Sequence, residues 1–516
     1  MKKFYLFVLV LGSIALLGND ALAQNTDFPW PDLGESMVIT PGAPGKINDV
    51  IHGDTTATGD RVHRHYILKR GQTYLYTARI QNSGYPLMVT AEEGDGPLPI
   101  IKALGPAAGE DEAERIFHAQ GDLYIKDLVL NGFDQGGNYT DNATVRLAAD
   151  SITVVCKSVV FDFNRQNNLR INAKECKLYV EDCIIANQGV AARLFQGFAV
   201  HFRGNWTPVV HMRNNTIYNM HNTAITNRQT ARYNKLIFEN NTVVNTGTGG
   251  SYYGRPDSLI VKNNLFVNVG ILGDGFQGDR DDFVEPHYYF VVDSKFTDTT
   301  NTTLLHPYVN YTNNHYYLDP AVAAALPDSS DKSTETLFHP YLLDLIGEGA
   351  SNIIEDEAFE FSNFPATIGE YENYINDFYQ FAETPSEMPQ FETDFRVLDF
   401  SYPESRGAYS AATDGGPLGD RNWFPDYVSG IVDLVDNQLN VYPNPASDLI
   451  RVRFNNIESG TLSITDMIGR EVKHMLIIGQ NEVSVNTSDL QNGMYLVRFI
   501  DDRNSSSSIK KIILQK

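Results

Sequence analysis

Basic side chains gather in one stretch of an otherwise acidic chain. From Val190 to Lys262 the sequence has eight Lys or Arg residues against two carboxylates, whereas the whole chain carries a formal net charge of -24. The basic residues are Arg193, Arg203, Arg213, Arg228, Arg232, Lys235, Arg255 and Lys262, with His201, His211 and His221 among them. Such a patch attracts a polyanion locally, while the global charge argues against nucleic acid as a partner.

These residue types fit the cleavage of a uronate polymer by β-elimination. That reaction needs a base for the C-5 proton, a cation to neutralise the carboxylate and an acid for the leaving oxygen. The candidates for catalysis are His201, His221, Arg228, Arg232 and Lys235. The candidates for substrate binding, which include aromatic rings that stack on sugars, are Trp206, His211, Arg213, Tyr252, Tyr253 and Arg255. The alternative is that these are separate structural or solvated side chains.

A second cluster consists of carboxylates in a glycine-rich loop. Its members are Asp274, Asp279, Asp281, Asp282 and Glu285. Oxygen ligands at this density can hold Ca²⁺, so calcium is the one cofactor that the sequence suggests. The spacing does not fit an EF-hand, and Arg280 competes for the carboxylates, so a solvated acidic loop is the alternative.

The elements that position these residues repeat along the chain. Similar strand-like motifs occur at Leu123–Asn131, Leu178–Ala186, Val210–Tyr218, Leu236–Val244 and Leu259–Val267. The polar residues that follow the strands are Asp127, Ser158, Asp182, Asn214, Asn240, Asn263 and Asn313, spaced by 31, 24, 32, 26, 23 and 50 residues. This period predicts one coil of a solenoid per repeat. Asn suits the turn because it tolerates a left-handed backbone and can hydrogen-bond to the Asn of the next coil.

Alternation within each motif predicts which side chains face the core. In the motif at 236, Leu236, Phe238 and Val243 are expected to point inward, and Lys235, Ile237 and Glu239 outward. The same register places His211, Arg213 and Lys262 on the outside. An inward Arg would be a buried unpaired charge in a narrow core.

The pattern resembles the right-handed parallel β-helix of the pectate-lyase type. The string Gly416-Pro-Leu-Gly-Asp-Arg-Asn-Trp-Phe-Pro425 resembles the end of β-helix proteins in an exported family of no assigned function. The expected fold is therefore all-β, with a single-stranded parallel β-helix and N-terminal cap over residues 24–320. An acidic region over residues 321–430 would close it, with Trp423 and Phe424 plugging the open end.

Both ends of the chain carry targeting signals. Residues 1–23 have a basic start, an apolar core and an Ala21-Leu22-Ala23 cleavage pattern, which predicts a secretory signal peptide; no transmembrane segment is expected. Residues 438–516 begin with Tyr442-Pro-Asn-Pro-Ala-Ser-Asp448 and read as a small β-sandwich. Their motifs resemble the type IX secretion sorting domain, which implies recognition by that machinery and a secreted or surface-attached protein. A sugar-binding sandwich is the alternative.

The sequence favours a secreted lyase acting on an anionic polysaccharide. A non-catalytic polysaccharide-binding or cell-surface β-helix protein is the rival. A glycoside hydrolase ranks third because hydrolysis needs a carboxylate pair, and the basic stretch offers only Glu239 and Asp257 on different coils. Cys156, Cys176 and Cys183 have neither a zinc-site spacing nor a disulfide framework, and Cys156 is expected to be a small buried hydrophobe.

Overall fold

The structure of the chain is a computed structural model. It describes residues 28–105, 115–140, 143–189, 196–204, 206–227, 232–247, 249–271, 290–292, 307–325, 338–347, 349, 353–355, 359–363, 398–424, 439–454, 459–466, 471–478, 480–501 and 507–516. The chain divides into two compact units, one ending at Pro425 and the other spanning Asp426–Lys516.

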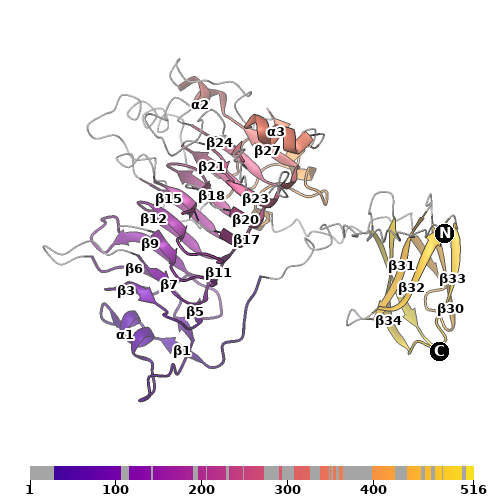
Figure 1. Cartoon of the computed structure of the whole chain (residues 1–516), viewed down its shortest axis with the longest axis horizontal. Helices are drawn as coiled ribbons and strands as arrows, with labels where there is room; N and C mark the ends of the chain where they lie inside the picture. Colours follow the sequence, from indigo (N-terminus) through magenta and orange to yellow (C-terminus); the bar gives the residue numbers. More distant parts are fainter. Residues whose placement is uncertain are drawn as a thin grey trace, which may run out of the picture. The chain divides into compact units, whose positions relative to one another are not determined.

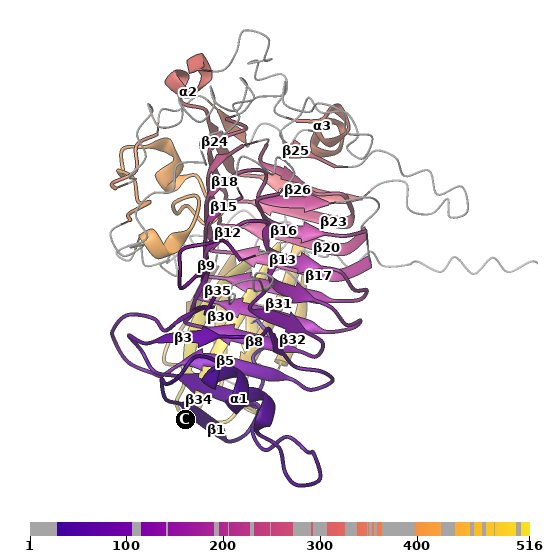
Figure 2. The same cartoon turned by 90° about the vertical axis from the view of Figure 1, so that its left-hand side faces the viewer.

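The first unit is a parallel β-helix whose coils stack strands into three sheets (Figures 1 and 2). Sheet 1 contains β1 (Ser36–Ile39), β2 (His65–Leu68), β5 (Leu87–Ala91), β8 (Leu123–Lys126), β11 (Thr153–Lys157), β14 (Lys177–Glu181), β17 (Trp206–Arg213), β20 (Arg232–Glu239), β23 (Arg255–Lys262) and β26 (Tyr308–Thr312). The all-β fold with a right-handed parallel β-helix is therefore confirmed.

In the eight coils from β2 to β25, a strand of sheet 2 and then a strand of sheet 3 follow each strand of sheet 1. Sheet 2 contains β3 (Thr73–Tyr76), β6 (Ile100–Ala103), β9 (Val129–Asp134), β12 (Val160–Asn164), β15 (Ile184–Gln188), β18 (Thr216–Met220), β21 (Thr242–Thr246), β24 (Leu265–Val269), β27 (Asn314–Tyr317) and β28 (Ile353–Glu355). Sheet 3 contains β4 (Ile80–Gln81), β7 (Phe117–Ala119), β10 (Ala143–Leu147), β13 (Asn167–Ile171), β16 (Phe198–Phe202), β19 (Ile225–Asn227), β22 (Ser251–Tyr252) and β25 (Phe290–Val291).

The short turn from sheet 1 to sheet 2 has a left-handed residue in each of seven coils. All seven residues predicted to mark these turns have positive φ, from 51° at Ser158 to 58° at Asn263. The side-chain ladder, however, is made by the next residue in the last four of these turns, namely Asn215, Asn241, Asn264 and Asn314. Asn241 accepts from Asn215 at 2.8 Å and donates to Asn264 at 3.1 Å. These amides face the coil interior and are fully buried, which is why they need one another as partners.

The core runs the length of the β-helix. Leu236, Phe238 and Val243 are fully buried in it, so the predicted inward face is confirmed. At the beginning, α1 (Lys46–Gly53) adds two isoleucines to this core. Beyond β26, α3 (Pro340–Ile346) adds Leu342 and Ile346, and a short α2 (Pro320–Ala325) precedes it. The three cysteines are buried and unbridged.

Residues 398–424 pack on the side of the β-helix. The indole Nε1 of Trp423, in the 3-10 helix Arg421–Trp423, donates to Thr216 Oγ1 at 2.6 Å. The same hydroxyl donates to the buried carboxylate of Asp420 at 2.7 Å. Thr216 begins β18, and four further strands of sheet 2 lie beyond it. The expectation that Trp423 and Phe424 plug the open end is therefore wrong. The half-buried indole N–H of Trp423 needs a polar partner, and Thr216 on the side of the β-helix supplies it.

The second unit is a two-layered antiparallel β-sandwich. One sheet contains β29 (Leu439–Tyr442), β30 (Leu449–Phe454) and β33 (Glu482–Asn486). The other contains, in order, β32 (Glu471–Ile478), β31 (Ser459–Asp466), β34 (Gly493–Asp501) and β35 (Ser507–Leu514). Phe454 and Phe499 meet between the sheets at 4.8 Å. Asn444 of the Tyr-Pro-Asn-Pro motif donates to Lys511 O and accepts from Ile513 N, so this motif closes the edge of β35.

Candidate functional site

The outer face of sheet 1 carries charges of both signs at one register position. The residues aligned on adjacent strands are Lys126, Lys157, Glu181, Arg213, Glu239 and Lys262. Glu181, only 5% exposed, pairs with Lys157 at 2.6 Å and also with Arg213. We call this row the charge ladder. Lys157, Arg213 and Lys262 pair with ladder carboxylates one coil away, whereas Lys126 lies 3.8 Å from its sequence neighbour Asp127.

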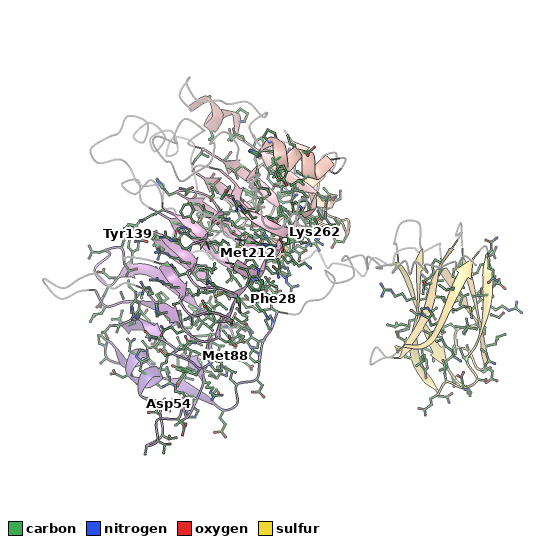
Figure 3. The ribbon with its side chains drawn as sticks, in the orientation of Figure 1. Phe28, Asp54, Met88, Tyr139, Met212 and Lys262 are labelled. Atoms are coloured by element: carbon green, nitrogen blue, oxygen red, sulfur yellow. The ribbon has the colours of Figure 1, made fainter. Side chains whose placement is uncertain are left out.

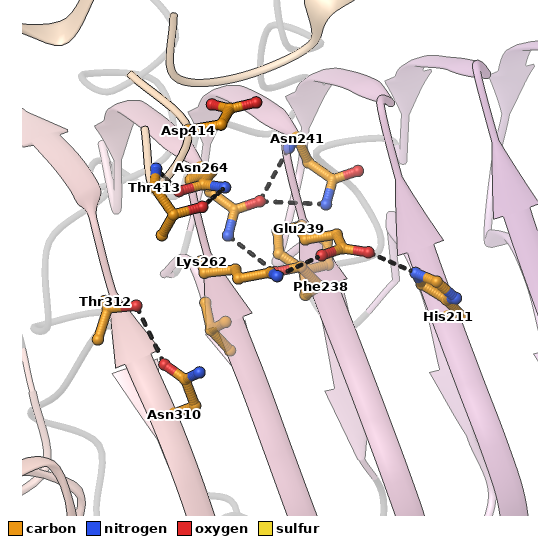
Figure 4. Close-up of polar contacts among 12 residues, drawn as sticks. His211, Phe238, Glu239, Asn241, Lys262, Asn264, Asn310, Thr312, Thr413 and Asp414 are labelled. Carbon is orange, nitrogen blue, oxygen red and sulfur yellow. Dashed lines mark hydrogen bonds and ion pairs between the residues drawn. The ribbon is translucent and has the colours of Figure 1, made fainter. Parts of the chain in front are cut away.

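Glu239 is the second carboxylate of the charge ladder (Figure 4). It accepts from His211 Nε2 at 2.8 Å, and Lys262 Nζ lies 3.2 Å from its other oxygen. Burial opposes ionisation of Glu239, but the bond from His211 and the charge of Lys262 outweigh it and lower its pKa to about 2. Lys262 and His211 therefore interact with Glu239 within the fold.

An N-terminal strap, residues 28–35, covers an apolar row beside this ladder. The row consists of Met88, Tyr124, Val155, Tyr179 and His211, aligned on neighbouring strands. Phe28 and Met88 are labelled in Figure 3. Phe28 stacks on His211 at 5.0 Å, meets Tyr179 edge-on at 5.4 Å and lies under the Arg213 guanidinium at 4.4 Å. His211 and Arg213 do face outward as predicted, but His211 is only 2% exposed because the strap lies over it.

Four other predicted residues lie on β17, β20 and β23. Trp206, Arg232 and Arg255 are aligned at the beginnings of these strands, and Lys235 lies three residues further along β20. Trp206 is 40% exposed and donates to Asn234 Oδ1 at 2.7 Å. Arg232 pairs with Asp257 at 3.1 Å. The structure thus brings Trp206, Arg232 and Arg255 to one register position, and the charge of Arg232 is compensated by Asp257.

Two predicted site residues, His221 and Tyr253, are fully buried in the interior. Tyr253 is fully buried in the core beside Phe290, so its expected role in binding sugar is wrong. His221 is also fully buried, and burial lowers its pKa to about 4. A Cβ at Gly189 or Gly197 would come within 2.6 Å of His221 Cβ, which shows how tightly the ring is enclosed. The expectation that His221 is an accessible catalytic group is therefore wrong.

Several predicted residues lie outside the part of the chain that the structure describes. These are Arg228 and the calcium candidates Asp274, Asp279, Asp281 and Asp282. Within the described residues, no group of three His, Cys, Asp or Glu side chains is arranged to hold a metal ion. The calcium site stays a prediction.

His201 belongs to a different face, the outside of sheet 3. Its register partners on the preceding strands are Arg170, then Arg146, then His118. Four strands in succession, β7, β10, β13 and β16, thus present a basic or imidazole side chain at one position. We call this row the basic ladder. On the following strands, Thr226 is the partner of His201, and Tyr252 comes next on β22.

The basic ladder is held by the core behind it. Val145, Leu169 and Val200, each directly before a ladder residue, are fully buried and point inward, so alternation turns the next side chain outward. Arg146 and Arg170 are half-buried, whereas His118 and His201 are 8% and 6% exposed. Beside His118, the guanidinium of the buried Arg115 lies 3.4 Å from Nδ1. Among the described residues, the buried Nε of Arg146 has no hydrogen-bond partner.

Sequence reasoning missed three of these four residues because it searched for charge that is dense along the chain. His118, Arg146, Arg170 and His201 are separated by 28, 24 and 31 residues. That is the coil period itself, which the turn residues had already revealed. Aligning the coils on those turns and reading down each column would have found the row.

The comparisons with known proteins concern the second unit. Residues 440–515 match the family described as the secretion system C-terminal sorting domain. This assigns the second unit as a sorting domain, and the protein is exported through type IX secretion to the cell surface or the extracellular space. The signal peptide at residues 1–23 lies outside the described residues and stays a prediction. None of the helices in the described part of the chain is both long and apolar enough to span a membrane.

No comparison assigns an activity to the β-helix. No curated protein matches the chain. A solved structure of PorZ, described as an essential surface component of the type-IX secretion system of Porphyromonas gingivalis, is 19% identical over 26% of this chain and 19% of that chain. Its TM-score is 0.15, and a likeness at this level carries no argument.

Proposed function

We propose that the exported β-helix binds an anionic, uronate-containing polysaccharide along the outer face of sheet 3 and cleaves it by β-elimination. The observation that supports this proposal is the basic ladder of His118, Arg146, Arg170 and His201 on four successive strands. On sheet 1, carboxylates alternate with cations along the charge ladder, and the strap covers the row beside it. The basic ladder has four side chains of basic type in succession, and this run of one residue class supports sheet 3 as the face for a polyanion.

The repeat of the β-helix suits an extended polymer. Adjacent parallel strands are about 4.8 Å apart, so the four ladder positions span roughly 14 Å. An extended acidic glycan laid across the strands would meet one positive or polar group per coil. The planar guanidinium groups of Arg146 and Arg170 can each bind a carboxylate through two hydrogen bonds.

The same row offers the groups that β-elimination needs. Arg146 and Arg170 would neutralise the uronate carboxylate and so favour loss of the C-5 proton. His201 would take that proton, because an imidazole is substantially neutral near pH 7. The bond from C-4 to the glycosidic oxygen then breaks, a C4–C5 double bond forms, and the oxygen takes a proton from water. Tyr252, two strands further on, would contact the neighbouring sugar.

One observation favours the second candidate function, binding without cleavage. His201 is only 6% exposed, and a base must reach a sugar carbon. A packed imidazole fits the wall of a binding surface as well as it fits a base. The proposed mechanism therefore has to be separated experimentally from simple binding.

The test uses the mature protein and a panel of uronate, sulfated and neutral glycans. We expect the uronates to bind and release an unsaturated product that is followed by its absorbance. Arg146→Gln with Arg170→Gln should weaken binding by about a hundredfold, since two charge-assisted hydrogen-bond sets are lost. The control, Lys157→Gln on sheet 1, should bind as the parent does.

His201→Gln separates the two candidate functions. If His201 is the base, this variant binds glycan within about threefold of the parent and forms no unsaturated product. If the parent binds but never forms product, the lyase is excluded and the binding protein remains. If the arginine pair can be changed without loss of binding, sheet 3 is not the site.

A further inference from the structure

The four-stranded sheet β32-β31-β34-β35 is one layer of the sorting domain (Figure 1). Its outer face exposes large apolar side chains. Leu476 on β32 is 68% exposed, the highest value among the large hydrophobic residues that are exposed in the described chain. Met494 and Ile513, paired with each other across β34 and β35, are 38% and 39% exposed. Leu496 is half-buried on the same side of β34. Soluble domains seldom gather such residues on one face without a partner.

Two basic side chains are exposed on this face. Arg498 and Lys511 are both exposed, and the register places Arg498 beside Ser463 and Lys511 beside Leu496. Thr461 and Thr465 complete the centre of the face on β31, where Thr465 is the register partner of Glu471 at the start of β32. Within the described residues, neither Arg498 nor Lys511 has an ion-pair partner. The centre of the face therefore combines apolar area with two exposed cations.

The outer face of the three-stranded sheet differs in this respect. It also exposes apolar side chains, Leu449 at 45% and Tyr442 at 38%. Its polar groups, however, are paired with each other: Tyr442 donates to Glu482 at 2.6 Å, and Arg451 lies 4.0 Å from the same carboxylate. Pairing of this kind leaves less charge to offer a partner.

The sorting domain is nearly neutral, whereas the rest of the chain is strongly acidic. Residues 439–516 contain nine Lys or Arg against eight Asp or Glu, while the full chain carries -24. An acidic partner would therefore repel the rest of the chain and accept the sorting domain by this face. Electrostatic complementarity of that type sets orientation and speeds encounter.

We propose that the outer face of the sheet β32-β31-β34-β35 is the surface by which the sorting domain docks on the export machinery. The partner that it fits is a protein that presents an apolar patch flanked by carboxylates. Leu476 and Met494 enter the apolar patch, and Arg498 and Lys511 meet the carboxylates. This proposal is independent of what the β-helix binds.

The experiment follows export of the full chain in a bacterium that has type IX secretion. The variants are Leu476→Asp and Arg498→Glu on the proposed face and Leu449→Asp on the opposite sheet. The measurement is the ratio of chain outside the cell to chain in the periplasm. We expect each face variant to lower this ratio roughly tenfold, as for loss of a central interface residue. Leu449→Asp should stay within about twofold of the parent.

Melting of the purified full chain provides the second measurement. All three substitutions are at exposed positions, so the melting temperature of the sorting domain should be unchanged. Normal export of both face variants would overturn the proposal, as would an equal defect in Leu449→Asp. A Leu476→Asp protein that melts earlier, together with normal export of Arg498→Glu, indicates a folding defect and also overturns it.

Other occupants of the face give different results. A second copy of the chain would make the parent dimeric in sedimentation, and Leu476→Asp would dissociate the dimer without affecting export. A lipid surface would show as binding to vesicles of anionic lipid that Arg498→Glu abolishes, again with normal export. Either result would assign the face to that occupant and overturn docking on the export machinery.

Discussion

Sheets 1 and 3 of the β-helix both align basic side chains on successive coils, yet the order of residue types along the two rows differs. On sheet 1, Lys157, Glu181, Arg213, Glu239 and Lys262 alternate in sign and pair along the stack. On sheet 3, His118, Arg146, Arg170 and His201 follow one another with no carboxylate among them. The charge of a sequence segment therefore does not show whether a cation in it is already paired, because on sheet 1 the pairing carboxylate lies one coil away.

The largest effect on stability is expected at Glu181. It is buried between Lys157 and Arg213, so Glu181→Ala removes the shared partner of two cations. We expect the free energy of unfolding to fall by about 3 kcal/mol, the typical effect of breaking a buried pair. Urea denaturation measures this loss, with Lys126→Ala at the exposed end of the ladder as the control.

The same Glu181→Ala variant should keep its affinity for glycan. If its affinity fell as far as that of the Arg146 and Arg170 double variant, glycan binding would depend on sheet 1 as well as on sheet 3, and the proposed difference between the two faces would be wrong. A loss of stability smaller than that of the control would show that the charge ladder is a surface feature of little consequence.

The strap gives the next largest effect. Phe28→Ala removes the ring that contacts His211, Tyr179 and Arg213, and we expect a loss of about 2 kcal/mol. Limited proteolysis should cut the strap sooner than in the parent. Trp30→Ala, at a position 38% exposed, is the matched control and should change both measurements less. Equal cleavage of Phe28→Ala and the parent would mean that Phe28 does not hold the strap on sheet 1.

The last prediction concerns the pH dependence of the stability of the β-helix, to which Glu239 on sheet 1 contributes. Its pKa is lowered from 4.5 to about 2, so its stabilisation is present above pH 4.5 and is lost as the pH falls towards 2. Glu239→Gln should therefore make the melting temperature depend less steeply on pH across that window than it does in the parent. Asp420→Asn is the control: burial raises the pKa of Asp420 to about 7, so its effect lies at higher pH. If the melting temperature of Glu239→Gln fell at acid pH as steeply as that of the parent, Glu239 would not be the source of this pH dependence.

The repeat, its turns and its faces could be predicted from sequence because they depend on local geometry. A left-handed turn residue such as Asn214 or Asn240 is recognisable from its own type and from the strand before it. Alternation is equally local, so Phe238 could be placed inside and Glu239 outside. The sorting domain could be recognised because its motifs, such as Tyr442-Pro-Asn-Pro, close its own strand edges.

Only the tertiary structure decided which outward side chains are open and which cations are paired. Phe28 covers His211 although they are far apart in sequence, and residues 398–424 turned out to clamp the side of the coils rather than their end. His221 and Tyr253 have the types expected of a site, but close packing encloses them. Stacking of coils brings together residues some 25 to 30 positions apart. Burial and charge pairing depend on these spatial neighbours, which are not neighbours in the sequence.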